Sequence, residues 1–116
     1  EAIRTHRIKN VIFVSGDVHG SLTSRLAHSR DPGFEVHTIV SSPLCNSLLL
    51  PYATTSSFIF GEPMVRAPSG EYRSELTSKV VSQDNFAQLR VTAQSVRVTF
   101  HGRDGSPLEV VDIPLR

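Results

Sequence analysis

The chain has 116 residues, and its twelve basic and eleven acidic side chains give a formal charge of +1. This length supports one domain, residues 1–116, with one modest core. The near-neutral charge argues against a nucleic-acid-binding surface or an anionic membrane as partner. The single cysteine, Cys45, excludes an internal disulfide and a thiolate zinc cluster. The apolar run at residues 48–50 stops at Pro51 and is too short for a membrane span.

The first predicted strand covers residues 11–14, where β-branched and aromatic side chains dominate and Gly16 interrupts the run after Ser15. Asp17 and His19 follow in the connection. A carboxylate and an imidazole suit divalent or trivalent ions such as manganese, iron, zinc or calcium, and an extended backbone would turn both side chains to one side. We therefore predict that Asp17 and His19 are metal ligands.

A short helix is expected next. Ser21 is a suitable N-cap, Leu22 and Leu26 are one helical turn apart, and the Asp-Pro-Gly sequence at residues 31–33 would end the helix. Residues 34–40 then alternate in polarity, which predicts a strand.

Pro43 is expected to end this strand, because proline cannot donate to a sheet ladder. Residues 44–52 are expected to form a packed loop or one helical turn. Residues 53–84 are interrupted by Gly61, Pro63, Pro68 and Gly70, and we expect a long loop there, either a rim beside an active site or a disordered segment.

In the last third of the chain, the sequence predicts three strands, at residues 86–92, 96–101 and 108–113. Asp104 and Gly105 form a strong hairpin signal between the second and third of them. The predicted fold class is therefore α/β but β-rich, ending in an antiparallel three-strand meander, with at most one or two short helices.

Three segments together resemble PhoD-like alkaline phosphatases of the calcineurin-like metallophosphatase superfamily. They are the Val-Ser-Gly-Asp-Val-His segment at residues 14–19, the Ser-Ser strand end at residues 39–44, and the strand introduced by Asn-Phe at residues 85–91. In the serine/threonine-type branch, Gly-Asp-x-His-Gly is followed by Gly-Asp-x-x-Asp-Arg-Gly and Gly-Asn-His-Glu. Neither motif occurs in residues 21–116.

The resemblance covers about residues 8–111. It implies the C-terminal portion of a two-sheet metallophosphatase sandwich, with Asp17 and His19 in the inner coordination shell of a two-metal site and a phosphate ester as substrate. The family segments that carry the remaining ligands are absent from these residues.

Five residues are candidate neighbours of this site: Ser15, Gly16, Gly20, Ser41 and Ser42. The serines could bind phosphate, or they could satisfy local turns, which is the commoner role of serine at strand ends.

The predicted function is the C-terminal portion of a metal-dependent phosphatase or phosphodiesterase that is inactive alone, because a catalytic ion needs roughly three protein ligands. The alternative is a non-catalytic β-rich binding or assembly module, in which residues 16–20 are simply a turn. A portion of a sandwich would also expose sheet faces and strand edges, so a homo-oligomer is expected.

Overall fold

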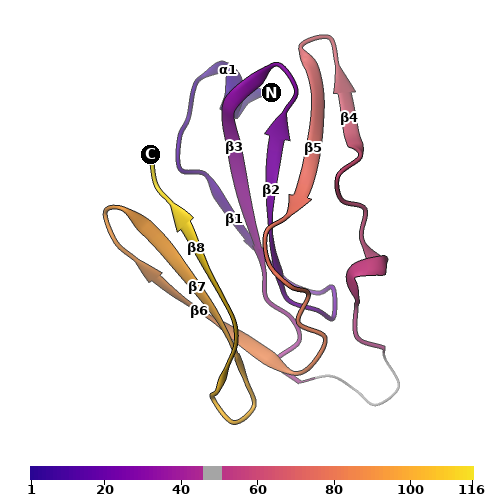
Figure 1. Cartoon of the computed structure of the whole chain (residues 1–116), viewed down its shortest axis with the longest axis vertical. Helices are drawn as coiled ribbons and strands as arrows, with labels where there is room; N and C mark the ends of the chain where they lie inside the picture. The colour runs from indigo at the N-terminus through magenta and orange to yellow at the C-terminus, as the bar shows by residue number, and fades with distance from the viewer. Residues whose placement is uncertain (46–50) are drawn as a thin grey trace.

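The computed structural model describes residues 1–45 and 51–116, and across these residues the strands form two sheets (Figure 1). The first sheet has the strand order β1-β3-β2-β5-β4, and the second has the order β6-β7-β8. β1 runs parallel to β3, and the other neighbouring strands are antiparallel. The predicted β-rich fold class, with two sheets and a C-terminal antiparallel meander, is confirmed.

The first sheet consists of β1 (Ile12–Ser15), β2 (Leu22–His28), β3 (Asp31–Val40), β4 (Pro63–Ala67) and β5 (Gly70–Leu76). The second consists of β6 (Asn85–Val91), β7 (Ser95–Gly102) and β8 (Pro107–Pro114). Within residues 1–45 and 51–116, helical structure is limited to α1 (Ala2–Thr5) and the 3-10 turn η1 (Thr55–Ser57). Among the described residues, none of the helices is long and apolar enough to cross a membrane.

The helix predicted after Ser21 is wrong, because this segment forms strand β2. Leu22 and Leu26 are four residues apart, a spacing that suits both a helix face and a strand face, since four is also a multiple of the strand period. The Asp-Pro-Gly sequence at residues 31–33 belongs to β3, next to an irregularity in its pairing with β2. The tight turn is instead made by Ser29 and Arg30.

The long loop predicted for residues 53–84 is also wrong, because β4 and β5 lie within it. Pro63 starts β4 at the edge of the sheet, where a missing donor is tolerated. Gly70 starts β5 with a φ of 141°, and a Cβ there would lie 2.8 Å from the His28 ring. Pro63 therefore marks the start of a strand, and Gly70 marks a close contact inside the sheet.

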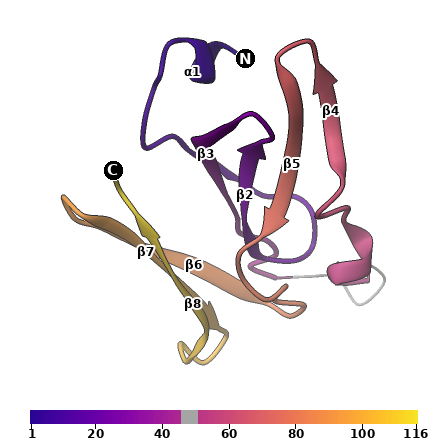
Figure 2. The ribbon, with the colours of Figure 1, turned by 45° about the horizontal axis from the view of Figure 1, so that its top comes forward.

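The two sheets meet over an apolar core. The strands of the second sheet run obliquely across the first, as Figure 2 shows. The buried side chains are contributed mostly by β7, with further residues from β3, β8 and the β5–β6 connection: Ile39, Val81, Val96, Val98, Phe100 and Ile113. Val96, Val98 and Phe100 alternate with more exposed residues along β7, as the sequence predicts for a strand with one solvated side.

The segment predicted as a packed loop or helical turn, residues 44–52, is described only in part, since residues 46–50 lie outside the described residues. Leu44 and Cys45 are exposed, and the chain from Pro51 to Thr54 has neither helix nor strand.

Candidate metal centre

Both predicted metal ligands lie in the loop that connects β1 to β2. The loop has to pass the carboxyl end of β3, because β3 separates these two strands in the sheet. Asp17 and His19 have φ angles of 66° and 56°, in the left-handed region. The predicted extended backbone is therefore wrong, since the chain bends here to cross from one strand to the other. Aspartate and histidine are among the non-glycine residues that tolerate this region best.

The side chains of Asp17 and His19 line the same hollow, with a volume of about 330 Å³. Val18 lies between them. Tyr52 and Ser57, which belong to the segment between β3 and β4, line the hollow from the other side. Asp17 is exposed and His19 is half-buried. Within residues 1–45 and 51–116, neither side chain forms a hydrogen bond or an ion pair. A carboxylate and an imidazole are thus both free to bind a ligand in one place.

The facing wall of the hollow is held in place by hydrogen bonds at Ala53, one of them to the loop. The Ala53 N–H donates to the His19 carbonyl oxygen at 2.8 Å, and the Ser82 hydroxyl donates to the Ala53 carbonyl oxygen at 2.6 Å. A Cβ on Gly20 would lie 3.1 Å from the Ala53 Cβ, so glycine allows this close approach. These contacts position Tyr52 and Ser57, which the sequence did not single out because the segment reads as an irregular loop.

Two candidate neighbours, Ser15 and Gly16, connect the loop to β3. The Ser41 N–H donates to the Ser15 carbonyl oxygen at 2.9 Å, and a Cβ on Gly16 would lie 3.1 Å from the Ser41 carbonyl oxygen. The Ser41 hydroxyl accepts a hydrogen bond from the Ala87 N–H at 3.1 Å. The Ser41 hydroxyl is therefore hydrogen-bonded to β6 of the second sheet.

Ser42 belongs to a buried polar cluster with Ser21 and Asn85. The Ser21 hydroxyl accepts from the Ser42 N–H at 2.9 Å and lies 2.6 Å from the Asn85 Oδ1. The Asn85 N–H donates to the Pro43 carbonyl oxygen at 2.9 Å. All three side chains are largely buried. Ser42 takes part through its main-chain N–H and carbonyl groups, and the cluster joins the end of the β1–β2 loop to the start of the second sheet.

A buried carboxylate lies behind the hollow. The Tyr52 hydroxyl donates to Asp84 Oδ1 at 2.7 Å, and Arg103 Nη1 lies 3.6 Å from Asp84 Oδ2. The hydrogen bond to Asp84 raises the pKa of Tyr52 above its ordinary value. The same hydrogen bond fixes the orientation of Tyr52 at the wall of the hollow.

The donor set fits a metal ion but does not complete a site. Aspartate oxygen and histidine nitrogen are ligands for zinc, manganese and iron. In the part of the chain that the structure describes, no group of three or more histidine, cysteine, aspartate or glutamate side chains is placed to hold an ion. Asp17 and His19 could therefore supply only a share of a coordination shell.

No protein-family model matches the chain, and neither a curated protein nor a solved structure matches it. The resemblance to PhoD-like phosphatases consequently stays a prediction that depends on the residues at positions 14–19, 39–44 and 85–91.

Proposed function

We propose that this chain is part of a metal-dependent phosphoesterase, in which Asp17 and His19 are two of the ligands of the metal centre. One observation carries the proposal. A carboxylate and an imidazole, both without partners among the described residues, line one solvent-accessible hollow. Their left-handed backbone conformations support it further, because strained conformations of this kind gather at functional sites.

The residues of the loop would each have a defined task. Asp17 offers an anionic oxygen, and His19 offers a neutral imidazole nitrogen. When bound, divalent ions in such hydrolases polarise the phosphoryl group and lower the pKa of water. The contact between His19 and Ala53 holds the loop against its facing wall, which fixes the position from which the imidazole can reach an ion.

Two ligands are fewer than the roughly three that a catalytic ion requires, so the proposal needs further ligands from another polypeptide segment. Residues 1–116 alone are therefore expected to hydrolyse phosphate esters poorly or not at all. Turnover at ordinary enzyme rates of about 1 s⁻¹ or more would contradict this expectation.

Weak metal binding by the partial site can be tested by paramagnetic line broadening. Substoichiometric Mn²⁺ is expected to broaden the amide signals of residues 16–20 and Ala53 selectively, with Thr99 in the second sheet as internal reference. Asp17→Ala and His19→Ala should each remove the effect. His101→Ala, which alters a histidine of the second sheet, should leave it unchanged. Equal broadening in wild type and in the two ligand variants would overturn the proposal.

The alternative function is a non-catalytic β-rich module. The lack of a group of three ligand side chains within the described residues favours it. This alternative predicts no selective broadening at residues 16–20. The same titration therefore separates the two functions.

A further inference from the structure

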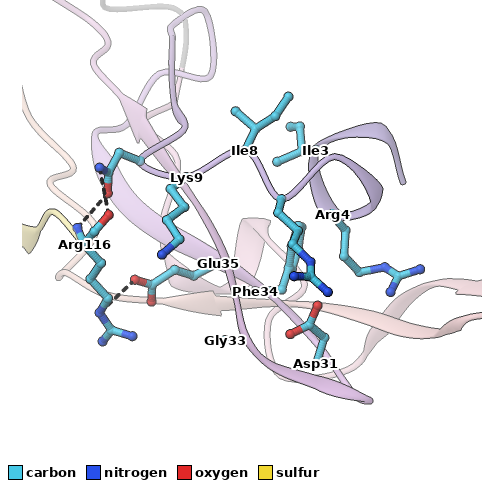
Figure 3. A pocket seen from close by; sticks show the side chains of 11 residues that line it. Ile3, Arg4, Ile8, Lys9, Asp31, Gly33, Phe34, Glu35 and Arg116 are labelled. Atoms are coloured by element: carbon cyan, nitrogen blue, oxygen red, sulfur yellow. Dashed lines mark hydrogen bonds and ion pairs between the residues drawn. The ribbon is translucent and has the colours of Figure 1, made fainter.

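A second hollow lies toward the opposite end of β3 from the β1–β2 loop that carries Asp17 and His19 (Figure 3). It has a volume of about 490 Å³ and lies between the N-terminal segment, the first residues of β3 and Arg116. Asp17 and His19 follow β1, whose last residue pairs with Val40, whereas this hollow begins at Asp31. Gly33, Phe34 and Glu35 of β3 also line the hollow, so about five residues of this strand separate it from the loop, roughly 17 Å at about 3.3 Å per residue.

The lining of this hollow is cationic in a chain that is nearly neutral. Four of the twelve basic side chains line it, against the two carboxylates of Asp31 and Glu35. Arg4 is paired with Glu1 at 3.1 Å. Among the described residues, Arg7 and Lys9 form no ion pair. Two positive charges are thus left without a partner at one concave place.

Arg116 closes one side of the hollow and is fixed by both its main chain and its side chain. Its N–H donates to Asn10 Oδ1 at 2.8 Å, and Asn10 Nδ2 donates to the Arg116 carbonyl oxygen at 3.1 Å. Its Nε lies 3.5 Å from Glu35 Oε1. Figure 3 shows Lys9 extending toward the same Glu35. The positive wall is therefore held by contacts between the two ends of the described chain.

Arg7 occupies a backbone position that normally belongs to glycine. The Ile8 N–H bonds to the Ile3 carbonyl at 2.9 Å and the Arg7 N–H to the Arg4 carbonyl at 3.1 Å, which is the hydrogen-bond pattern of a helix C-terminal Schellman motif. Arg7 has the left-handed φ of 52° that this motif requires. An arginine is strained there, and the fold itself gains nothing evident from its guanidinium. This points to a role for the charge.

The lining of the hollow also includes apolar side chains. Ile3 and Ile8 lie side by side, as Figure 3 shows, and Phe34 forms another part of the lining. Pockets for small organic ligands commonly combine such an apolar surface with a few convergent polar groups, in a volume of roughly 300–1,000 Å³.

We propose that this hollow binds a small organic anion, with a phosphate or carboxylate group on a compact apolar body. Arg7 and Lys9 pair with the anionic group, while Ile3, Ile8 and Phe34 pack against the body. Arginine suits this task because its guanidinium can donate two parallel hydrogen bonds to phosphate or carboxylate oxygens. The proposal does not depend on the metal centre.

Binding can be tested by calorimetry with phenylphosphonate and benzoate, neither of which a phosphoesterase can hydrolyse. We expect saturable binding of at least one of them with a dissociation constant at or below the millimolar range, and weaker binding of inorganic phosphate, which lacks the apolar body. The preferred anion distinguishes a phosphate ligand from a carboxylate ligand. Absence of saturable binding of both probes would overturn the proposal.

Arg7→Gly is the decisive variant, because glycine relieves the strain in the turn while it removes the charge. We expect affinity for the preferred probe to fall at least about tenfold, as for the loss of a charged hydrogen bond, while the melting temperature stays the same or rises. Lys9→Gln should also weaken binding, whereas Lys79→Gln, which changes the other lysine of the chain, should not. Unchanged affinity in both Arg7→Gly and Lys9→Gln would contradict the proposed site.

Discussion

Backbone strain is distributed unequally between two regions of the molecule. One region consists of the connections on either side of β1, and the other is the second sheet. All four non-glycine residues with positive φ in the described part of the chain lie beside β1: Arg7, Asn10, Asp17 and His19. In the second sheet the positive φ belongs to Gly105, where no side chain is strained. Strain of this kind persists only where the surrounding structure compensates for it. The comparison suggests that the second sheet serves as a scaffold and that both candidate sites depend on the connections beside β1.

Truncating the core of the scaffold should have the largest effect. Phe100 is fully buried between the sheets. Phe100→Ala should lower the free energy of unfolding by about 3–5 kcal/mol, through lost burial and the cavity that remains. Urea unfolding provides the measurement. Phe86→Ala, at a phenylalanine that is 42% exposed, is the matched control and should cost much less. Equal losses for the two variants would show that the second sheet does not hold the core.

Breaking the polar link between the two regions should have the next largest effect. Asn85→Ala removes the partner of Ser21 and leaves buried polar groups unsatisfied. We expect a loss of about 1–3 kcal/mol in unfolding free energy. In the same variant, amide signals of residues 16–20 should shift, because the cluster anchors the end of that loop. A chemical-shift map in which the loop is unperturbed would mean that the scaffold does not position the proposed metal ligands, Asp17 and His19.

Self-association remains a prediction, and the edge strand β1 is where it can be tested. Among the strands that the structure describes, β1 pairs only with β3, and its Phe13 and Val14 are 54% and 62% exposed. Exposed apolar edges of this kind favour pairing with another chain. Light scattering should report a dimer or larger species, and Phe13→Lys should reduce the measured mass. Leu44→Lys, at an exposed residue outside the strands, should not. A monodisperse wild-type monomer would contradict the prediction.

The smallest effect is expected at the surface of the scaffold. Arg97 donates hydrogen bonds of 2.8 and 2.9 Å to the Asp112 carboxylate, and these lower the pKa of Asp112 below its ordinary value. Because the folded-state pKa is the lower one, the pair stabilises the fold above about pH 4 and this contribution is lost as the pH falls further. Asp112→Asn should therefore flatten the acid limb of the stability profile slightly. Superimposable profiles for both proteins would contradict this.

The sequence predicts the scaffold better than the first sheet, for physical reasons that the residues make clear. Val96, Val98 and Phe100 alternate without ambiguity, and Asp104 with Gly105 marks the hairpin. Leu22 and Leu26 suit either period, and only pairing with β3 and β5 decides for a strand. Such long-range pairing leaves no local signal.

The two candidate sites differ in the same way. Asp17 and His19 are two residues apart, so a local motif can predict them, although not their left-handed backbone. The proposed anion pocket depends on Asn10 and Arg116, which are 106 positions apart and meet only in the folded chain. No pattern within one segment could have predicted it.

The most direct test of the central claim is the nitrogen-15 spectrum of the histidine imidazoles during a Zn²⁺ titration. The account predicts that the ring signals of His19 shift first, and that Asp17→Ala weakens this response while His28 and His37, which are buried or nearly so, stay unchanged. Zinc-dependent shifts at other histidines with none at His19, or a His19 response that Asp17→Ala leaves intact, would contradict the claim that the two side chains bind one ion together.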